Sequence, residues 1–209
     1  MMLSPITMIL RGYNQNEVAC VAEVLLNSTY VKNMEITMNT ENALEIIEFI
    51  SNEYGEKLNV GAGTVQTFSE LEAVVKAGAT FALSPRMMTP EMLAYCKRHN
   101  ILSIPGAFTA SEIADSYYQG GDVIKIFPAN EVSISYANKV KEPMGNIPLM
   151  AVGGINASNV FEALEGGYDY IGTAGGLFRK VDIKNKDKNA MMESLKIFET
   201  EVARFFNKK

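Results

Sequence analysis

Residues 33–60 read NMEITMNTENALEIIEFISNEYGEKLNV: a short apolar run, a helical pattern, and the start of a second apolar run. Within residues 34–38, apolar and polar side chains alternate, which is typical of a β-strand. Thr40 then precedes residues 43–50, whose apolar side chains recur at helical spacing on one face. The second run, residues 58–60, completes a strand–helix–strand unit, and such a unit joins two parallel strands.

This unit recurs along the whole chain. Eight apolar runs are expected to form strands: residues 6–10, 34–38, 58–60, 81–83, 101–104, 123–127, 147–152 and 168–171. Helices are expected after Asn16, Thr40, Thr67, Thr89, Thr109 and Asn156 and over residues 189–206, with capping boxes at Thr67/Glu70 and Thr109/Glu112 and a proline start at Pro90. Residues 179–189 are charged and poor in apolar side chains, so we expect a loop there. Eight βα units predict a single (β/α)8 TIM barrel over residues 1–209, with an open doubly wound sheet as the alternative.

The composition argues against several classes of protein. Of the 209 residues, 47% are apolar and 21% are charged, as in ordinary globular proteins and unlike disordered ones. The net charge of −5 argues against a nucleic-acid partner, because binding to phosphates needs a basic face. No apolar run approaches the ~20 residues of a membrane span, and the first residues lack the pattern of a signal peptide. We therefore expect no membrane partner and a cytoplasmic protein.

The few cysteines and histidines restrict the chemistry further. Cys20 and Cys96 both lie in apolar helical patterns, so they are expected to be reduced core thiols. The single histidine, His99, lies in a polar segment typical of a helix end. One histidine is a poor supply for a histidine-based metal site or for a Ser-His-Asp triad. We therefore expect neither a metal nor another cofactor.

Lys125 is the most unusual polar residue of the predicted barrel. It lies in the run Val123-Ile124-Lys125-Ile126-Phe127, where alternation places Val123, Lys125 and Phe127 on one face. A lysine in mid-strand either faces solvent at the strand edge or is held in the low-dielectric interior. Burial lowers the pKa of an ammonium and frees a neutral amine that can form a Schiff base with a carbonyl. Both placements remain open at this point.

Glu35 is the second candidate. Glu35, Thr37 and Asn39 share one face of their strand, and the opposite face is apolar. A carboxyl group that faces a barrel interior is a candidate general acid/base, because burial raises its pKa. The alternative is a strand whose polar face is turned outward. Barrel strands are covered by helices outside and filled within, which favours the inward orientation.

Glycine-rich segments follow three of the predicted strands. These are Gly61-Ala62-Gly63-Thr64, Gly153-Gly154 and Gly172-Thr173-Ala174-Gly175-Gly176, after the third, seventh and eighth strands. Glycines after strands seven and eight suit an anion, because exposed backbone amides can surround a phosphate there. Arg11, at the end of the first strand, is either a cation at the same mouth or an ordinary surface arginine.

These residues together resemble the family of 2-keto-3-deoxy-6-phosphogluconate (KDPG) and 4-hydroxy-2-oxoglutarate (KHG) aldolases. The resemblance rests on Ile9-Leu10-Arg11, Glu35-Ile36-Thr37, Gly61-Ala62-Gly63-Thr64-Val65, Ser84-Pro85, Ile104-Pro105-Gly106, Lys125-Ile126-Phe127-Pro128-Ala129 and Gly153-Gly154-Ile155. It implies a metal-free homotrimer of TIM barrels that cleaves a keto acid to pyruvate and an aldehyde. Lys125 then resembles the Schiff-base lysine and Glu35 the general acid/base. The substrate contacts implied are Arg11, Asn39, Thr64, Phe127, Gly153, Gly154, Ala174 and Gly175.

The chain departs from the family pattern at several of these positions. Asn39 stands where many members carry arginine, Val152 where most carry threonine, and Ala174 where a hydroxyl residue is common. Loss of a guanidinium removes a bidentate contact to an anion, which leaves the substrate open. Two alternatives therefore remain: another phosphate-binding barrel enzyme such as an isomerase, and a non-catalytic relative that binds a keto acid or a phosphosugar.

Overall fold

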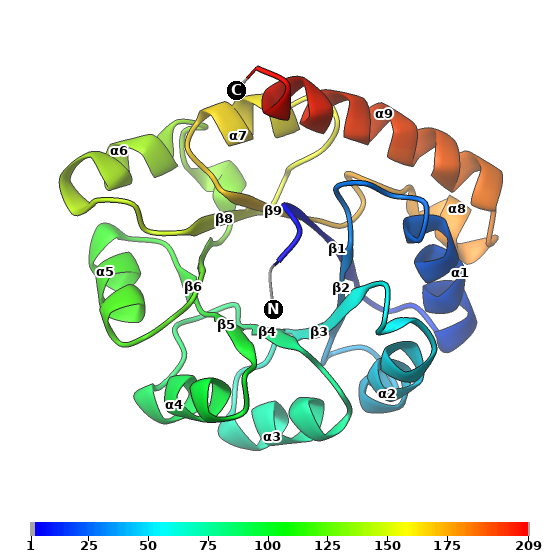
Figure 1. The fold of residues 1–209 in the computed structure, drawn as a ribbon, viewed down its shortest axis with the longest axis horizontal. Coiled ribbons are helices and arrows are strands. Elements are labelled where there is room, and N and C mark those ends of the chain that lie inside the picture. Colours follow the sequence, from blue (N-terminus) through cyan, green and yellow to red (C-terminus); the bar gives the residue numbers. More distant parts are fainter. Residues whose placement is uncertain (1–2, 209) are drawn as a thin grey trace.

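The computed structural model describes residues 3–208, which form a ring of parallel strands surrounded by helices (Figure 1). The strands are β1 (Ile6–Leu10), β2 (Asn33–Thr37), β3 (Asn59–Gly63), β4 (Phe81–Leu83), β5 (Leu102–Ile104), β6 (Gly106–Ala107), β7 (Ile124–Ile126), β8 (Leu149–Val152) and β9 (Tyr170–Thr173). The helices are α1 (Gln15–Leu25), α2 (Ala43–Tyr54), α3 (Phe68–Lys76), α4 (Pro90–Arg98), α5 (Ala110–Tyr118), the 3₁₀ turn η1 (Ala129–Glu131), α6 (Tyr136–Met144), α7 (Val160–Glu165), α8 (Lys180–Lys184) and α9 (Lys188–Phe206). The predicted TIM barrel is confirmed.

The strand order explains why the sheet has nine strands within residues 3–208 and not the eight expected. The order runs β5-β4-β3-β2-β1-β9-β8-β7-β6, and all pairs are parallel. β5 and β6 are two pieces of one segment that Pro105 interrupts, since proline has no N–H to donate to a ladder. The Lys125 amide nevertheless donates to the Pro105 carbonyl oxygen at 2.9 Å, and the Val123 amide donates to the Ser103 carbonyl oxygen at 3.2 Å. The ring therefore closes through this broken strand.

Two apolar clusters lie on opposite sides of the strands. The larger one fills the layer between the strands and the helices. The smaller one fills the barrel interior and consists of Leu3, Ile9, Phe81, Leu83, Ile104, Val123, Met150 and Val152. Alternation along each strand sends successive side chains to the two clusters, as in Met8 (outer) and Ile9 (inner). This smaller set, called the inner cluster below, surrounds the candidate site.

Several predicted helix starts are confirmed. Thr67 and Thr109 each accept from the backbone amide three residues on, and Glu70 and Glu112 complete the two capping boxes. Thr89 caps α4, which begins at Pro90. These helix starts could be predicted because the cap hydroxyl and its partner lie only three residues apart in the sequence.

Other starts are wrong by a few residues. α1 is capped by Asn14 and not Asn16, because Glu17 completes a capping box with Asn14. α2 begins after Asn42, in a left-handed conformation, while the Thr40 hydroxyl accepts from the Gly12 amide instead of capping a helix. α7 follows Asn159, three residues beyond the expected Asn156.

Residues 179–189 are not the single loop that the sequence predicts. They contain α8, and α9 already begins at Lys188, where Asp187 accepts from the Ala190 amide. Arg179 holds the buried Asp182 through two hydrogen bonds of 2.7 and 2.8 Å. The charged side chains therefore pair with one another around the first turn of a short helix, and this hides it from an apolar pattern.

The cysteines and the histidine lie as expected. Cys20 and Cys96 are buried and form no disulfide. His99 is the C-cap residue of α4, and its ring stacks on Tyr95 with centroids 4.1 Å apart. Within residues 3–208, no helix is long and apolar enough to cross a membrane. Across the same residues, no group of three or more His, Cys, Asp and Glu side chains is placed to hold a metal ion.

Candidate active site

Lys125 and Glu35 both point into the barrel interior. In the sheet register Glu35 lies beside Ile9, and Lys125 lies beside Met150. Ile9 and Met150 belong to the inner cluster, and register partners in parallel strands project to the same side. Glu35 is 1% exposed and Lys125 is 5% exposed. The solvent-facing alternative for each side chain is therefore not what the structure shows.

The glycine-rich end of β3 makes room for the Glu35 carboxyl group. A Cβ atom at Gly63 would lie 1.5 Å from Glu35 Oε1, so a side chain at position 63 would displace the carboxyl group. Glu35 Oε2 is buried and has no hydrogen-bond partner within residues 3–208. A buried carboxylate oxygen without a donor costs stability. Because it has a free acceptor position, it can accept a hydrogen bond from a ligand or a water molecule.

Electrostatics shifts both groups toward their neutral forms. Burial raises the pKa of the Glu35 carboxyl above its usual value, although the positive charges of Lys125 and Arg11 oppose this. Burial lowers the pKa of the Lys125 ammonium, the Glu35 carboxylate raises it, and the Arg11 guanidinium lowers it again. A lysine with a lowered pKa and a carboxyl group with a raised pKa are what Schiff-base and acid/base chemistry need near neutral pH. The Arg11 charge thus lowers the pKa of both groups.

Phe127 connects the buried pair to an open cavity. The Lys125 Nζ atom lies 4.8 Å from the centroid of the Phe127 ring. Phe127 is 38% exposed and lines a cavity of about 480 Å³ at the carboxyl ends of β1, β8 and β9. This cavity brings together six residues that the sequence singled out: Arg11, Phe127, Gly153, Gly154, Ala174 and Gly175. It has the size of a small-molecule site.

The cavity wall needs glycine at positions 153, 154 and 176 and leaves position 175 free. Gly153 and Gly154 adopt φ angles of 117° and 73°, which side-chain-bearing residues rarely adopt, and a Cβ atom on either would come within 2.9 Å of Asn130. At Gly176 a Cβ atom would lie 2.0 Å from the Ile155 carbonyl oxygen. At Gly175 it would meet no atom within 4 Å. Gly175 therefore presents its backbone to open space in the cavity.

Two of the candidate residues lie outside the cavity lining. Asn39 is exposed beyond the end of β2, and Thr64 follows β3 in a left-handed conformation with φ of 59°. A non-glycine residue in this conformation is uncommon and is often found at functional sites. Neither residue lines the cavity; they follow β2 and β3, which come next after β1 in the sheet.

Seven lining residues were not among the candidate site residues: Ile9, Val152, Ile155, Asn156, Gly172, Thr173 and Gly176. The Thr173 hydroxyl donates to the Ile155 carbonyl oxygen at 2.7 Å, which joins the loop after β8 to the end of β9. The signal for these residues was their position within or beside motifs that the sequence analysis quotes. A side chain that joins two loops is visible only once the loops are placed together.

The comparisons with known proteins agree with this geometry. The sequence model of a family described as "Aldolase: KDPG and KHG aldolase" matches residues 1–194. The chain is 26% identical to the 2-dehydro-3-deoxy-6-phosphogalactonate aldolase of Escherichia coli, over 84% of this chain and 85% of that protein. It is 33% identical to the 2-dehydro-3-deoxy-phosphogluconate aldolase of Treponema pallidum, over 63% of this chain and 62% of that protein.

Among solved structures, a KDPG aldolase from Legionella pneumophila superposes with a TM-score of 0.82 at 27% identity, over 92% of both chains. That protein was crystallised with pyruvate captured as a covalent carbinolamine intermediate. A family match over nearly the whole chain, together with this fold, is sufficient to assign the family. The chain belongs to the KDPG and KHG aldolase family, a family of carbon–carbon lyases on a TIM barrel.

Proposed function

We propose that this protein is a Schiff-base aldolase that cleaves KDPG to pyruvate and glyceraldehyde 3-phosphate. KHG, which would give pyruvate and glyoxylate, is the poorer substrate in this proposal. One observation carries the assignment: a lysine and a carboxyl group, both almost fully buried, share the interior of the barrel beneath an open cavity. Burial of two ionisable groups in an apolar interior costs stability, and this favours a functional role for Lys125 and Glu35.

Lys125 begins the reaction in this proposal. Its neutral amine attacks the C2 keto carbon of the substrate, and loss of water gives an iminium ion. This cation accepts the electron pair that is released when the C3–C4 bond breaks, so the aldehyde departs and an enamine of pyruvate remains on the lysine. Protonation of the enamine at C3, followed by hydrolysis, returns pyruvate and the free amine.

Glu35 moves the protons. In the cleavage step its carboxylate takes the proton of the C4 hydroxyl, directly or through a water molecule, and the resulting acid later protonates the enamine carbon. The partnerless Oε2 atom supports this role, because no donor of the described protein occupies it. The raised pKa of Glu35 also supports it, since the group must both accept and return a proton near neutral pH.

The cavity between β1, β8 and β9 supports a phosphorylated substrate. Gly153, Gly154 and Gly175 offer backbone that side chains do not cover, and Arg11 adds a positive charge at the same cavity. Exposed backbone amides and a guanidinium suit a phosphate better than a small uncharged aldehyde group. The names of the Escherichia coli and Treponema pallidum relatives also refer to phosphorylated sugar acids, one galactonate and one gluconate.

Substrate preference is tested by measuring kcat/KM for KDPG, for its galactonate counterpart and for KHG, in the parent protein and in Asn39→Arg. We expect KDPG to be used best. Asn39→Arg is expected to raise kcat/KM by roughly threefold to tenfold, because a charge-assisted hydrogen bond is about twice as strong as a neutral one. Equal or better use of KHG would contradict the phosphate assignment, and better use of the galactonate counterpart would move the proposal to that sugar.

We also propose that residues 1–209 act as a single domain, in a homotrimer in the cytoplasm. This follows the family resemblance and the uninterrupted barrel. Sedimentation equilibrium gives the oligomeric state: a mass three times that of the chain supports the trimer, and any other mass contradicts it.

A further inference from the structure

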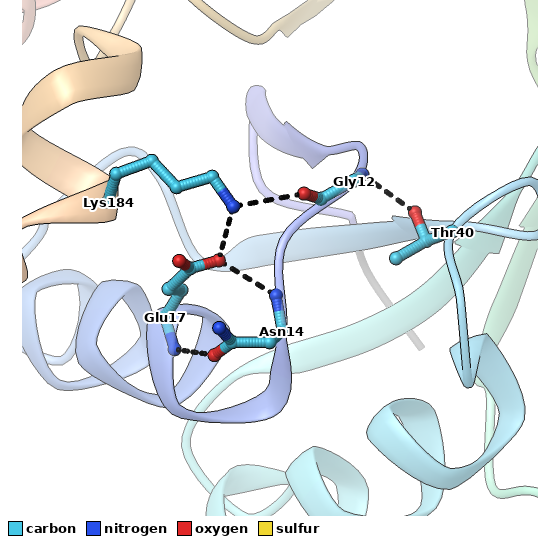
Figure 2. A network of polar contacts seen from close by, with 5 residues as sticks. All are labelled: Gly12, Asn14, Glu17, Thr40 and Lys184. Carbon is cyan, nitrogen blue, oxygen red and sulfur yellow. Dashed lines mark hydrogen bonds and ion pairs between the residues drawn. The ribbon is translucent and has the colours of Figure 1, made fainter.

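Both peptide groups that flank Arg11 are held from the end of β2. The Gly12 amide donates to Thr40 Oγ1 at 2.9 Å (Figure 2), and the Thr37 hydroxyl donates to the Leu10 carbonyl oxygen at 3.4 Å. The two threonine oxygens lie 3.0 Å apart. Each hydroxyl carries one hydrogen, so Thr40 donates to Thr37 while Thr37 donates to Leu10. The chain of hydrogen bonds thus runs from one side of Arg11 to the other.

A second set of contacts holds the same turn from the opposite side. Figure 2 shows the Lys184 ammonium reaching both the Gly12 carbonyl oxygen, at 3.3 Å, and Glu17 Oε2, at 2.9 Å. Glu17 is 6% exposed and also accepts from the Asn14 amide at 2.8 Å. Lys184 is the last residue of α8, the short helix that follows the glycine-rich end of β9. The contact therefore ties α8, which follows the cavity-lining end of β9, to the turn that carries Arg11.

The turn depends on these polar contacts. Gly12 has a φ of 71°, and a Cβ atom there would meet nothing within 4 Å. Packing therefore does not enclose the turn at Gly12, and Arg11 itself is exposed. A backbone segment in open surroundings keeps one conformation only if its N–H and C=O groups are held by specific partners.

We propose that Thr40 and Lys184, with Thr37 and Glu17 behind them, are positioning residues that hold the Arg11 turn so that the guanidinium stays at the cavity between β1, β8 and β9, which Arg11 lines. This inference rests on the proposed function, because it gives Arg11 a substrate to hold. None of the four positioning residues lines that cavity. They act on the reaction through Arg11, and displacement of a charged group by about 1 Å can cost up to 100-fold in rate.

The contact between Thr40 and the Gly12 amide is tested with Thr40→Val, Thr40→Ser and the matched control Thr80→Val. The Thr80 hydroxyl likewise bonds to the backbone of a distant segment, as a donor to the Val60 carbonyl oxygen, but Thr80 precedes β4 at the opposite end of the barrel. We expect Thr40→Val to lower kcat/KM for KDPG by roughly tenfold, mostly through KM, because the substrate anion loses its aligned cation. Thr40→Ser should restore most of the activity, and Thr80→Val should stay within about twofold of the parent.

The Lys184 side is tested with Lys184→Met against Lys188→Met. Lys188 pairs with Glu23 and so also joins α1 to a helix near the C-terminus, but away from the Arg11 turn. We expect Lys184→Met to lower kcat/KM for KDPG in the same manner as Thr40→Val, and Lys188→Met to leave it unchanged. Lys184→Arg should retain part of the activity, because a guanidinium can still donate to both oxygens.

A double-mutant cycle separates positioning from general destabilisation. Thr40 acts only through Arg11, so in an Arg11→Met background Thr40→Val should cost nothing further. The pH profile gives a second readout. Glu35 and Arg11 are the charged groups that act on Lys125, and Arg11 lowers the pKa of both Lys125 and Glu35. Loss of Arg11 in Arg11→Met should therefore shift the acidic limb of the kcat/KM profile to higher pH. Thr40→Val, which displaces Arg11, should shift this limb in the same direction.

Hydrogen exchange distinguishes failure of this inference from failure of the proposed function. Peptides spanning residues 9–16 should exchange faster in Thr40→Val and Lys184→Met than in the parent and the two controls, whether or not the protein cleaves KDPG. Unchanged exchange there, or an equal loss from Thr40→Val with and without Arg11, would overturn the inference. A parent protein that forms no adduct with pyruvate would instead overturn the proposed function.

Discussion

Asn33 and Glu35 lie two residues apart on the same face of β2, yet their polar atoms are treated in opposite ways. The Asn33 side chain, with no exposed surface, donates to the carbonyl oxygens of Ser4 and Ile6 and to the Thr7 hydroxyl, and accepts from the Ser4 amide and the Asn59 side chain. Glu35 is 1% exposed, and its Oε2 atom has no hydrogen-bond partner among the residues that the structure describes. Asn33 marks the amino-terminal end of the barrel and Glu35 the carboxyl-terminal part.

The difference separates stability from function along one strand. A buried polar network whose members are all satisfied rigidifies a fold, whereas a buried group without a partner costs stability unless a ligand completes it. In TIM barrels the active site lies at the carboxyl ends of the strands and the opposite face serves stability. The contrast between these two residues is thus what that division of the barrel predicts, and substitutions on each side can break or sharpen it.

The largest effect is expected from Lys125→Ala. Without the amine no iminium ion can form, so cleavage of KDPG should fall by roughly 10³-fold or more, to the level of the control without enzyme. The circular dichroism spectrum should not change, because the substitution removes an ionisable group from the barrel interior, where burial of its charge costs stability. Cleavage at near the parent rate would show that Lys125 is not the nucleophile.

Glu35→Gln should separate adduct formation from turnover. The amide keeps the shape of the side chain and loses the proton acceptor, so kcat should fall by about 10²- to 10⁴-fold while pyruvate still forms an adduct at Lys125. Single-turnover kinetics and trapping measure the two steps apart. A loss of less than tenfold would assign Glu35 to packing and not to proton transfer.

Asn33→Leu should produce the opposite pattern. It leaves several buried donors and acceptors without partners, so the free energy of unfolding should fall by about 3 kcal/mol. At temperatures where the variant is folded, kcat/KM should stay within about twofold of the parent. Urea unfolding and steady-state kinetics give both values. A large loss of activity in a folded protein would remove the proposed division between the two ends.

Gly175→Asp is expected to have the smallest effect. The new side chain enters open space in the cavity, so the melting temperature should not change, but its negative charge should lower kcat/KM for KDPG by roughly tenfold. Gly175→Asn is the matched neutral control and should lose less. The use of KHG should change less than that of KDPG in Gly175→Asp. Equal losses in both variants would point to crowding instead of charge.

Much of the fold was predictable from local signals. The capping boxes at Thr67 and Thr109 and the proline start of α4 place both partners within a few residues, so the sequence displays them directly. Helix α8 was not predicted because it has no apolar stripe. It has one buried apolar residue, Ile183, and Arg179 pairs with Asp182 at its start. The division of one strand into β5 and β6 follows from Pro105, which a pattern of apolar residues does not weigh.

The candidate site was predictable where alternation and chemistry coincide. Lys125 and Glu35 are polar residues in apolar strands, and closure of the barrel turns both inward. The position of Thr40 was misread because its partner, the Gly12 amide, is distant in the sequence. Contacts between loops that follow different strands depend on the closed ring. The hydrogen bonds of Thr40 and Lys184 to Gly12, beside Arg11, are therefore visible only in the three-dimensional structure.

The most direct test of the account is borohydride reduction in the presence of pyruvate, followed by peptide mass mapping. Reduction converts an iminium ion between pyruvate and an amine into a stable secondary amine, which marks the lysine that formed it. The account predicts one pyruvyl adduct, on Lys125, in the parent and in Glu35→Gln, and none in Lys125→Ala. Absence of an adduct in the parent, or an adduct on another lysine, would contradict it.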